Sequence, residues 1–268
     1  MSHRYDRGKI VLAVLSPAKT LDFDAVAQSQ KSSEPRFAMQ ANELATHLQS
    51  FSPADLSDLM GVSAKLGELN ADRFGHWGSD ATPQKQAILA FKGDVYMGLE
   101  AWTFGARELT SAQRRLRILS GLYGMLRPLD MIHPYRLEMG TRLQINGAGS
   151  LYDFWGASIT DSINDDLKSH RNRILVNLAS NEYFDSLDSK RIDARIITPV
   201  FKDLHKGKYK FLSFYGKRAR GLMARYLVQH KVETVKAIEA FAVDGYRYSE
   251  TESRDNTPVF LRDAPAAE

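Results

Sequence analysis

The 268-residue chain contains no cysteine. Disulfide bonds, thiolate metal sites and cysteine nucleophiles are therefore excluded, and the composition is compatible with a reducing setting. No apolar run approaches the roughly 20 residues that a membrane-spanning helix needs. The basic-then-apolar segment at residues 1–15 has too short an apolar stretch for a signal peptide. We expect a cytoplasmic protein with no membrane partner.

Several motifs that mark common ligand and catalytic sites are also missing. The chain has no phosphate loop of the form G-x-x-x-x-G-K, no G-x-G-x-x-G after a strand and no G-x-S-x-G nucleophile turn. Its seven histidines are scattered, and no pair has the spacing of metal ligands. We therefore expect no metal and no cofactor.

The pattern of apolar residues predicts strands interleaved with helices. Hydrophobic residues make up 43% of the chain and charged residues 25%, which are ordinary values for a globular protein. Buried strands are predicted at 10–15, 87–91 and 173–180. Two further strands, at 195–203 and 208–215, are predicted to form a hairpin. The predicted fold class is mixed α/β (α+β), with a mixed sheet and one helix-hairpin-helix element.

No linker or internal repeat divides the chain. We predict a single compact domain over residues 1–268, which begins with an N-terminal extension at 1–9. Residues 262–268 are predicted to be a disordered tail.

Positive side chains follow two predicted strands and begin one predicted helix. Lys19 and Lys92 come after the strands at 10–15 and 87–91, and Lys217, Arg218 and Arg220 lie in the first turns of a helix. Because a helix N-terminus carries partial positive charge, cations there are unfavourable unless an anion binds. The pattern indicates a phosphate site, in a chain whose net charge is +4. The alternative is that these side chains extend into solvent or pair with nearby acids.

A second group of cations lies near tyrosines. Arg114 and Arg117 share one face of a basic helix predicted at 111–119, and Arg127 follows it. Tyr96, Tyr123 and Tyr135 are near these arginines in sequence, and cations interleaved with aromatic rings are typical of a nucleic-acid surface. The alternative is a solvated helix face beside tyrosines of the core.

The segment from Leu59 to Phe74 resembles a helix-hairpin-helix element, and the helix that it follows begins near Ser52. Ser52 is a good N-cap, and Gly61 can end the first helix in a left-handed conformation. Backbone N–H groups of such a hairpin bind a DNA phosphate without reading bases, and Lys65 would assist. Ser63 replaces the second glycine of the element. Ordinary antiparallel helices are the alternative.

A covalent mechanism based on lysine is also open. A lysine amine that loses its proton among other cations can attack a sugar aldehyde. The candidate catalytic lysines are Lys19, Lys92 and Lys217. The possible proton carriers are Asp94, Glu138 and Glu182.

Several segments together resemble the YaaA family of bacterial peroxide stress proteins. They are "LSPAKTLDF", "QAILAFKGDVYMGL", "LSGLYGMLRPLDMIHPYRLEMGTRL", "LYDFWG", "NLASNEYF", "PVFKD" and "SFYGKRARGLMARY", and they run in order from residue 15 to residue 226. The resemblance implies a cytoplasmic protein that limits oxidative damage under hydrogen peroxide and lowers unincorporated iron. It also implies DNA binding through a positively charged cleft and a helix-hairpin-helix element.

The resemblance also indicates which residues would form the site. The motif cations fall on Lys19, Lys92, Arg127, Arg136, Lys217, Arg218 and Arg220. Their tyrosine companions, expected to stack on bases, fall on Tyr96, Tyr123, Tyr135 and Tyr183. No iron ligands are implied.

The leading hypothesis is a monomeric stress protein that binds double-stranded or distorted DNA. The rival is an enzyme, similar to a lyase or glycosylase, that acts on DNA or a nucleotide through a lysine. A direct iron-binding protein is disfavoured, because the chain lacks cysteines and paired histidines.

Overall fold

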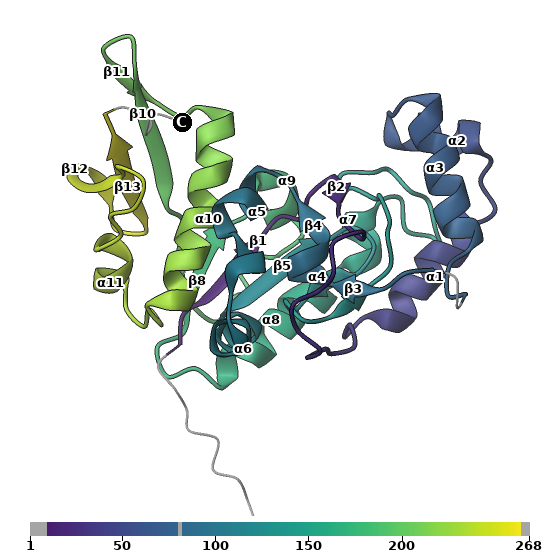
Figure 1. Ribbon diagram of the computed structural model, residues 1–268, viewed down its shortest axis with the longest axis horizontal. Helices are drawn as coiled ribbons and strands as arrows, with labels where there is room; N and C mark the ends of the chain where they lie inside the picture. Colours follow the sequence, from purple (N-terminus) through teal and green to yellow (C-terminus); the bar gives the residue numbers. More distant parts are fainter. Residues whose placement is uncertain (1–9, 80–81, 264–268) are drawn as a thin grey trace, which may run out of the picture.

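The computed structural model describes residues 10–79 and 82–263, and a five-stranded sheet lies at its centre (Figure 1). The strand order is β6-β5-β1-β8-β9. The bounds are β1 Leu12–Leu15, β5 Leu116–Ser120, β6 Gly124–Leu126, β8 Ile174–Leu178 and β9 Arg195–Ile197. β1 is parallel to β5 and β8, β9 is parallel to β8, and β6 is antiparallel to β5. The predicted mixed sheet is confirmed.

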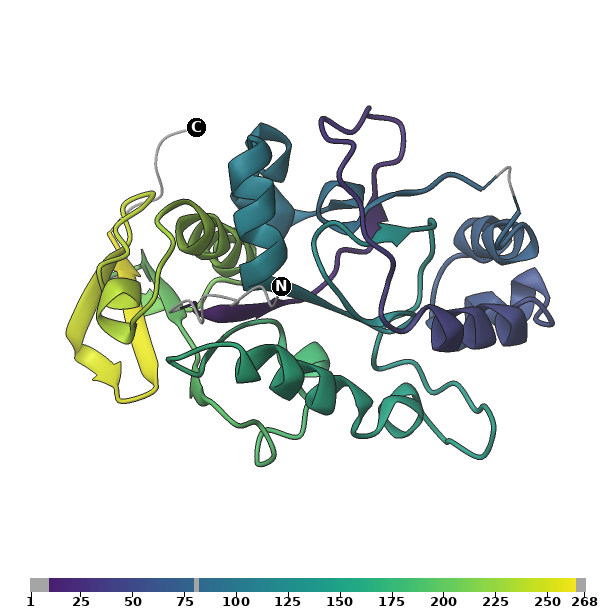
Figure 2. The ribbon, with the colours of Figure 1, turned by 90° about the horizontal axis from the view of Figure 1, so that it is seen from below.

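Helices cover both faces of this sheet. Figure 2 shows α6 (Ala106–Arg115) and α10 (Ser213–Gln229) on one side and α8 (Ser158–Lys168) on the other. α7 (Leu151–Trp155) precedes α8. β1, β5 and β8 are buried along their whole length, as strands covered on both faces are expected to be. One hydrophobic core extends from Val11 to Phe260, so the described residues form a single compact domain.

A second sheet lies at one end of the molecule. Its order is β11-β10-β13-β12, with bounds β10 Val200–His205, β11 Lys208–Lys210, β12 Arg247–Arg254 and β13 Thr257–Arg262. β10 and β11 form an antiparallel hairpin, as predicted. The strand predicted at 208–215 is too long, because β11 ends at Lys210 and α10 begins at Ser213. The strand predicted at 195–203 is divided between β9 and β10, which belong to different sheets. α11 (Val235–Glu239) lies beside this sheet (Figure 1).

A group of helices lies at the opposite end in both views (Figures 1 and 2). α1 (Ala38–Leu48) precedes α2 (Pro53–Met60) and α3 (Ala64–Gly75). Ser52 caps α2, and Gly61 ends it with φ +60°, as predicted. A β-carbon on Gly67 of α3 would lie only 2.4 Å from the Pro53 carbonyl, so the two helices pack at backbone distance. The Ser63 side chain makes no cap hydrogen bond. The helical pair is present, whereas its assignment as a DNA-binding helix-hairpin-helix element stays a prediction.

The predicted strand at 87–91 is wrong. Residues Ala87–Ala90 form a short helix, α4, and only Phe91–Lys92 are extended as β4, paired with β2 (Thr20–Leu21). A second short pair joins β3 (Lys85–Gln86) to β7 (Met131–Ile132). α5 (Asp94–Leu99) and a 3-10 turn (Ala101–Thr103) follow β4. Short apolar runs such as AILA fit a buried helix and a strand equally well.

The predicted basic helix at 111–119 also ends too late. α6 stops at Arg115, and β5 begins at Leu116. Arg117 therefore lies in a buried strand, where its Nε is 2.6 Å from Asp166 Oδ2. It does not share an exposed helix face with Arg114.

The predicted terminal tail begins too early. Arg262 closes β13 and is buried, and its Nε donates to Asp203 Oδ1 at 2.7 Å. The predicted extension at 1–9 and the end of the tail, 264–268, lie outside the described residues.

Candidate functional site

A cleft of about 450 Å³ opens beside the carboxyl ends of β1 and β8. Its walls are the segment from Ser16 to Thr20, the β4–α5 junction, the segment from Tyr135 to Glu138, α9 (Asn181–Phe184) and α10. In open α/β sheets, the crevice outside the carboxyl ends of the strands is the usual ligand site. The cleft therefore lies where the topology favours binding.

Hydrogen bonds between the ends of β1 and β8 form the base of the cleft. The Ser180 N–H donates to Ser16 Oγ at 2.9 Å, and Ser16 Oγ donates to Ser180 Oγ at 3.2 Å. The Tyr96 hydroxyl donates to the Ser16 carbonyl at 3.0 Å, which ties α5 to the same point. Ser16 and Ser180 were not predicted as site residues. The only sequence signal was that each follows a buried strand.

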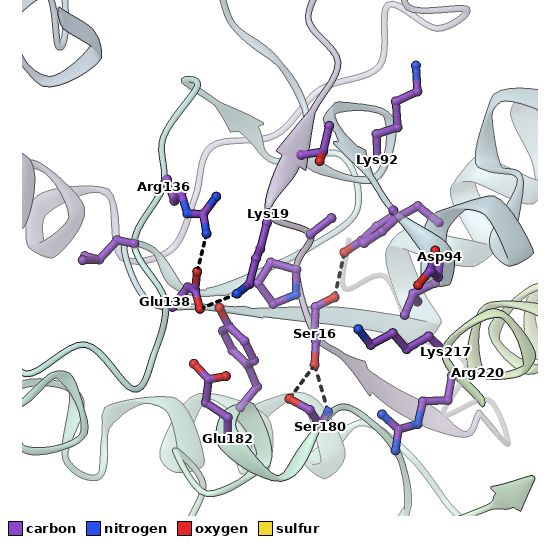
Figure 3. A pocket seen from close by; sticks show the side chains of 18 of the residues that line it. Ser16, Lys19, Lys92, Asp94, Arg136, Glu138, Ser180, Glu182, Lys217 and Arg220 are labelled. Atoms are coloured by element: carbon purple, nitrogen blue, oxygen red, sulfur yellow. Dashed lines mark hydrogen bonds and ion pairs between the residues drawn. The ribbon is translucent and has the colours of Figure 1, made fainter. Parts of the chain in front are cut away.

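One wall of the cleft is a network of two cations around one carboxylate. Lys19 Nζ lies 3.0 Å from Glu138 Oε2, and an Arg136 terminal nitrogen lies 3.0 Å from Glu138 Oε1 (Figure 3). The Nε of Arg136 is buried and has no hydrogen-bond partner among the described residues. Lys19 is 65% exposed, so its ammonium remains open to an incoming anion.

The opposite wall carries Lys217 and Arg220 from α10 (Figure 3). Among the described residues, no carboxylate lies within ion-pair distance of either side chain. Burial lowers the pKa of the Arg220 guanidinium below its ordinary value, although arginine stays charged at neutral pH. Two cations without carboxylate partners favour the binding of an anion between the walls.

Lys92 lies at the rim. Its Nζ donates to Asp22 Oδ2 at 3.2 Å, and its side chain points away from Lys217 and Arg220 (Figure 3). The pKa of Asp22 is lowered, first by the backbone hydrogen bond from Ala25 and then by Lys92. Lys92 therefore contributes less to the centre of the cleft than Lys19 does.

Two glycines allow α10 to reach this position. A β-carbon on Gly221 would lie 1.8 Å from the Val95 carbonyl oxygen, and one on Gly98 would lie 2.2 Å from the Arg218 carbonyl oxygen. α5 and α10 therefore touch through their backbones. This contact places Lys217 and Arg220 opposite Lys19.

The predicted stacking tyrosines are buried. Tyr96, Tyr135 and Tyr183 line the cleft but are only 2%, 5% and 7% exposed, and Tyr123 lies outside it. Burial raises the pKa of each of the three cleft hydroxyls, so all remain protonated at neutral pH. The rings of Tyr96 and Tyr135 pack against Phe91, and stacking on a base would require them to leave the core.

The remaining predicted cations lie elsewhere. Lys65 is on α3, at the far end of the molecule (Figure 1). Arg114 and Arg218 are exposed but do not line the cleft. Arg127 makes contacts within the protein that stabilise the fold. One of its terminal nitrogens lies 2.9 Å from buried Asp130 and donates to the Glu34 carbonyl.

Five positive side chains and three carboxylates line the cleft, an excess of two positive charges. The cations are Lys19, Lys92, Arg136, Lys217 and Arg220. The carboxylates are Asp94, Glu138 and Glu182, which were predicted as possible proton carriers. Glu182 accepts the Gly140 N–H at 3.0 Å. The arrangement can hold a phosphate between lysine and arginine groups, with acid or base groups nearby.

Two absences hold for residues 10–79 and 82–263, the part of the chain that the structure describes. Within these ranges no three potential ligands among His, Asp and Glu lie close enough together to hold a metal ion. The same ranges contain no helix with the length and apolar character needed to cross a membrane.

Known proteins are similar to this chain over almost its whole length. A family model described as "Peroxide stress protein YaaA" matches residues 11–252. A UPF0246 protein of Shewanella oneidensis is 49% identical over 256 residues, which cover 95% of this chain and 100% of that protein. A UPF0246 protein of Shewanella baltica is 48% identical over 255 residues, with 94% and 99% covered. One from Shewanella halifaxensis is 47% identical over 256 residues, with 95% and 100% covered.

Proposed function

The chain belongs to the peroxide stress protein YaaA family, and we propose that it serves this response by binding DNA through the cleft. Family membership supports a role in peroxide stress. The finer proposal is that the bound protein limits iron-driven oxidative damage in the cytoplasm. In this proposal the protein binds DNA phosphates and recognises the shape of the DNA more than its sequence.

The observation that carries this proposal is the convergence of Lys19, Arg136, Lys217 and Arg220 on one cleft. These residues are far apart in sequence, and solvated lysines and arginines ordinarily spread over a surface. Bringing them together raises their mutual repulsion, which a bound phosphate relieves. Arginine also offers a planar fork that fits phosphate oxygens.

Salt titration tests the proposal. Binding of a labelled DNA duplex, measured by fluorescence anisotropy between 50 and 200 mM salt, should weaken linearly in a log–log plot, because each phosphate contact releases counterions. Lys217→Ala combined with Arg220→Ala should reduce the slope by about 1.8, since each phosphate contact contributes about 0.9.

The matched control removes a lysine elsewhere. Lys190→Ala deletes an exposed cation outside the cleft and should leave the slope unchanged. If wild-type protein fails to bind DNA at low salt, the proposal is refuted. An unchanged slope in the double variant would exclude α10 from the site.

A second candidate function is catalysis on DNA through a lysine. The observation that favours it is that Lys19 and Lys217 share a cleft with Asp94, Glu138 and Glu182. In this mechanism a lysine amine attacks the aldehyde carbon of an abasic sugar, and the resulting imine forms with loss of one water. A carboxyl group would donate the proton to the departing oxygen.

Borohydride trapping separates the two functions. Borohydride reduces the imine to a stable amine, which links the protein covalently to abasic DNA. Trapping that persists in Lys92→Ala but disappears in Lys217→Ala or Lys19→Ala would favour the enzyme. DNA binding without any trapping would rule out this mechanism.

A further inference from the structure

We propose that residues 204–214, which we call the arm, form a second DNA-binding surface that takes unpaired bases next to the cleft. The arm comprises the end of β10, the hairpin turn, β11 and the first residues of α10. The inference rests on the proposed function, because it names the form of DNA that the same protein binds. Figure 1 shows the hairpin rising past the N-terminal end of α10.

Exposed apolar side chains are concentrated in the arm. Of the nine large hydrophobic residues that are exposed in the described part of the chain, four belong to residues 204–214. Phe211 is 53% exposed and Phe214 is 55% exposed. Folding alone leaves such rings in water only at a cost, and a cluster of them marks a contact surface.

The arm is also strongly positive. Residues 204–232 contain no Asp or Glu, and Lys206, Lys208 and Lys210 lie at or beside the hairpin turn. Lys206 and Gly207 both have positive φ, of 51° and 75°, as a tight two-residue hairpin turn requires. Lys208 pairs with His205, and Lys210 pairs with Asp203, so both lysines lie on one face of the hairpin.

The arm is continuous with the cleft. Phe214 and Lys217 are three residues apart on α10, so they are neighbours on the helix surface, about 4.5 Å apart along its axis. Lys217 lines the cleft. A β-carbon on Gly216 would lie 2.4 Å from the Phe211 ring, so this ring also rests on the start of α10. A strand whose phosphate contacts Lys217 can therefore present its next base to a phenylalanine.

Protection of a sheet edge explains only part of this surface. β11 is an edge strand, and lysines on edge strands prevent pairing with other chains. Exposed phenylalanines work against that protection. Rings beside phosphate-binding lysines are the arrangement that single-stranded nucleic acid requires, because each base stacks on a ring while its phosphate pairs with a cation.

The test compares two DNA probes and three protein variants. The first probe is a fully paired duplex. The second is the same duplex with a central run of unpaired bases, one of which is the fluorescent base 2-aminopurine. Wild-type protein should bind the second probe more tightly and should change the 2-aminopurine fluorescence.

Phe211→Leu combined with Phe214→Leu removes both rings but keeps apolar side chains. This variant should lose roughly tenfold in affinity for the unpaired probe, lose the fluorescence change and bind the duplex within about twofold of wild type. Lys206→Ala, Lys208→Ala and Lys210→Ala together should lower the salt slope for single strands by up to about 2. Met39→Ala removes an apolar side chain that is 82% exposed on α1 and serves as the matched control. Equal melting temperatures show that each variant is folded.

Several results would overturn the proposal. If Lys217→Ala weakens binding and the arm variants bind as wild type does, the arm is not used and the proposed function survives. If wild type binds neither probe, the proposed function and the arm fail together. If the arm variants lose flotation with anionic lipid vesicles but keep DNA binding, the arm is a membrane surface instead.

Discussion

Glu138 offers the sharpest test of how the cleft binds an anion, because one carboxylate there faces two cations. Glu138→Gln keeps the shape of the side chain but removes its charge. Both Lys19 and Arg136 then lose their ion-pair partner, and any phosphate in the cleft loses a repulsive neighbour. We expect Glu138→Gln to bind DNA more tightly than wild type.

The size of the effect follows from Coulomb's law. A unit negative charge about 6 Å from a phosphate repels it by about 0.7 kcal/mol in water and about 2.8 kcal/mol at an effective dielectric constant of 20. Glu138 is 26% exposed, so the lower part of this range applies. A gain of about 1 kcal/mol corresponds to roughly fivefold tighter binding. Loss of the ion pair with exposed Lys19 should cost about 0.2–1 kcal/mol of stability.

Anisotropy titrations at 50 and 200 mM salt measure this gain. It should shrink at higher salt, because screening shortens the reach of the field. Asp165→Asn is the matched control, since it removes one negative charge from an exposed pair with Lys168 on α8. Unchanged or weaker binding by Glu138→Gln, or equal tightening by Asp165→Asn, would refute the role given to the cleft.

Three further predictions concern the fold that supports the cleft. Asp166→Asn leaves the buried Arg117 guanidinium without its counter-charge and should lower the free energy of unfolding by about 3–5 kcal/mol in urea titrations. Burial would raise the pKa of Asp166, but hydrogen bonds and charge from Arg117, and then from Arg36, outweigh it and hold the pKa below its ordinary value. This stability is therefore present above about pH 4 and lost as pH falls through the lowered pKa, and Asp166→Asn should show a smaller loss in acid melts. Gly221→Ala places a methyl group against the Val95 carbonyl and should destabilise the protein by about 3 kcal/mol and weaken DNA binding, whereas normal values for both would contradict the close helix contact.

Local sequence patterns were sufficient to predict many of the elements. The apolar runs at β1 and β8, the hairpin turn after His205 and the cap at Ser52 each depend on residues within one segment. The boundary between α6 and β5, in contrast, depends on a residue far away in the sequence. Arg117 looks like a helix-surface residue, and only its pairing with Asp166, 49 positions away, explains why it lies in a buried strand.

The residues of the cleft could be predicted only in part, because the sequence does not show which distant residues the fold brings together. Lys19, Lys92 and Lys217 were candidates because each stood beside an element boundary, and the strand order brought Lys19 and Lys217 to facing walls. The tyrosines show the limit of this reasoning. A tyrosine near a cation in sequence can lie in the core or on the surface, and Tyr96 and Tyr135 are in the core.

The position of the cleft is a consequence of topology and of two glycines. β1 pairs in parallel with β8, so the chain segments that leave these strands begin at the same edge of the sheet, where the Ser180 N–H donates to Ser16 Oγ. If α10 packed on α5 at the ordinary distance between helix axes, its cations would lie further from Lys19. Because Gly98 and Gly221 allow backbone contact with α5, Lys217 comes close enough to face Lys19 across the gap. The glycines therefore determine the width of the cleft, although neither lines it.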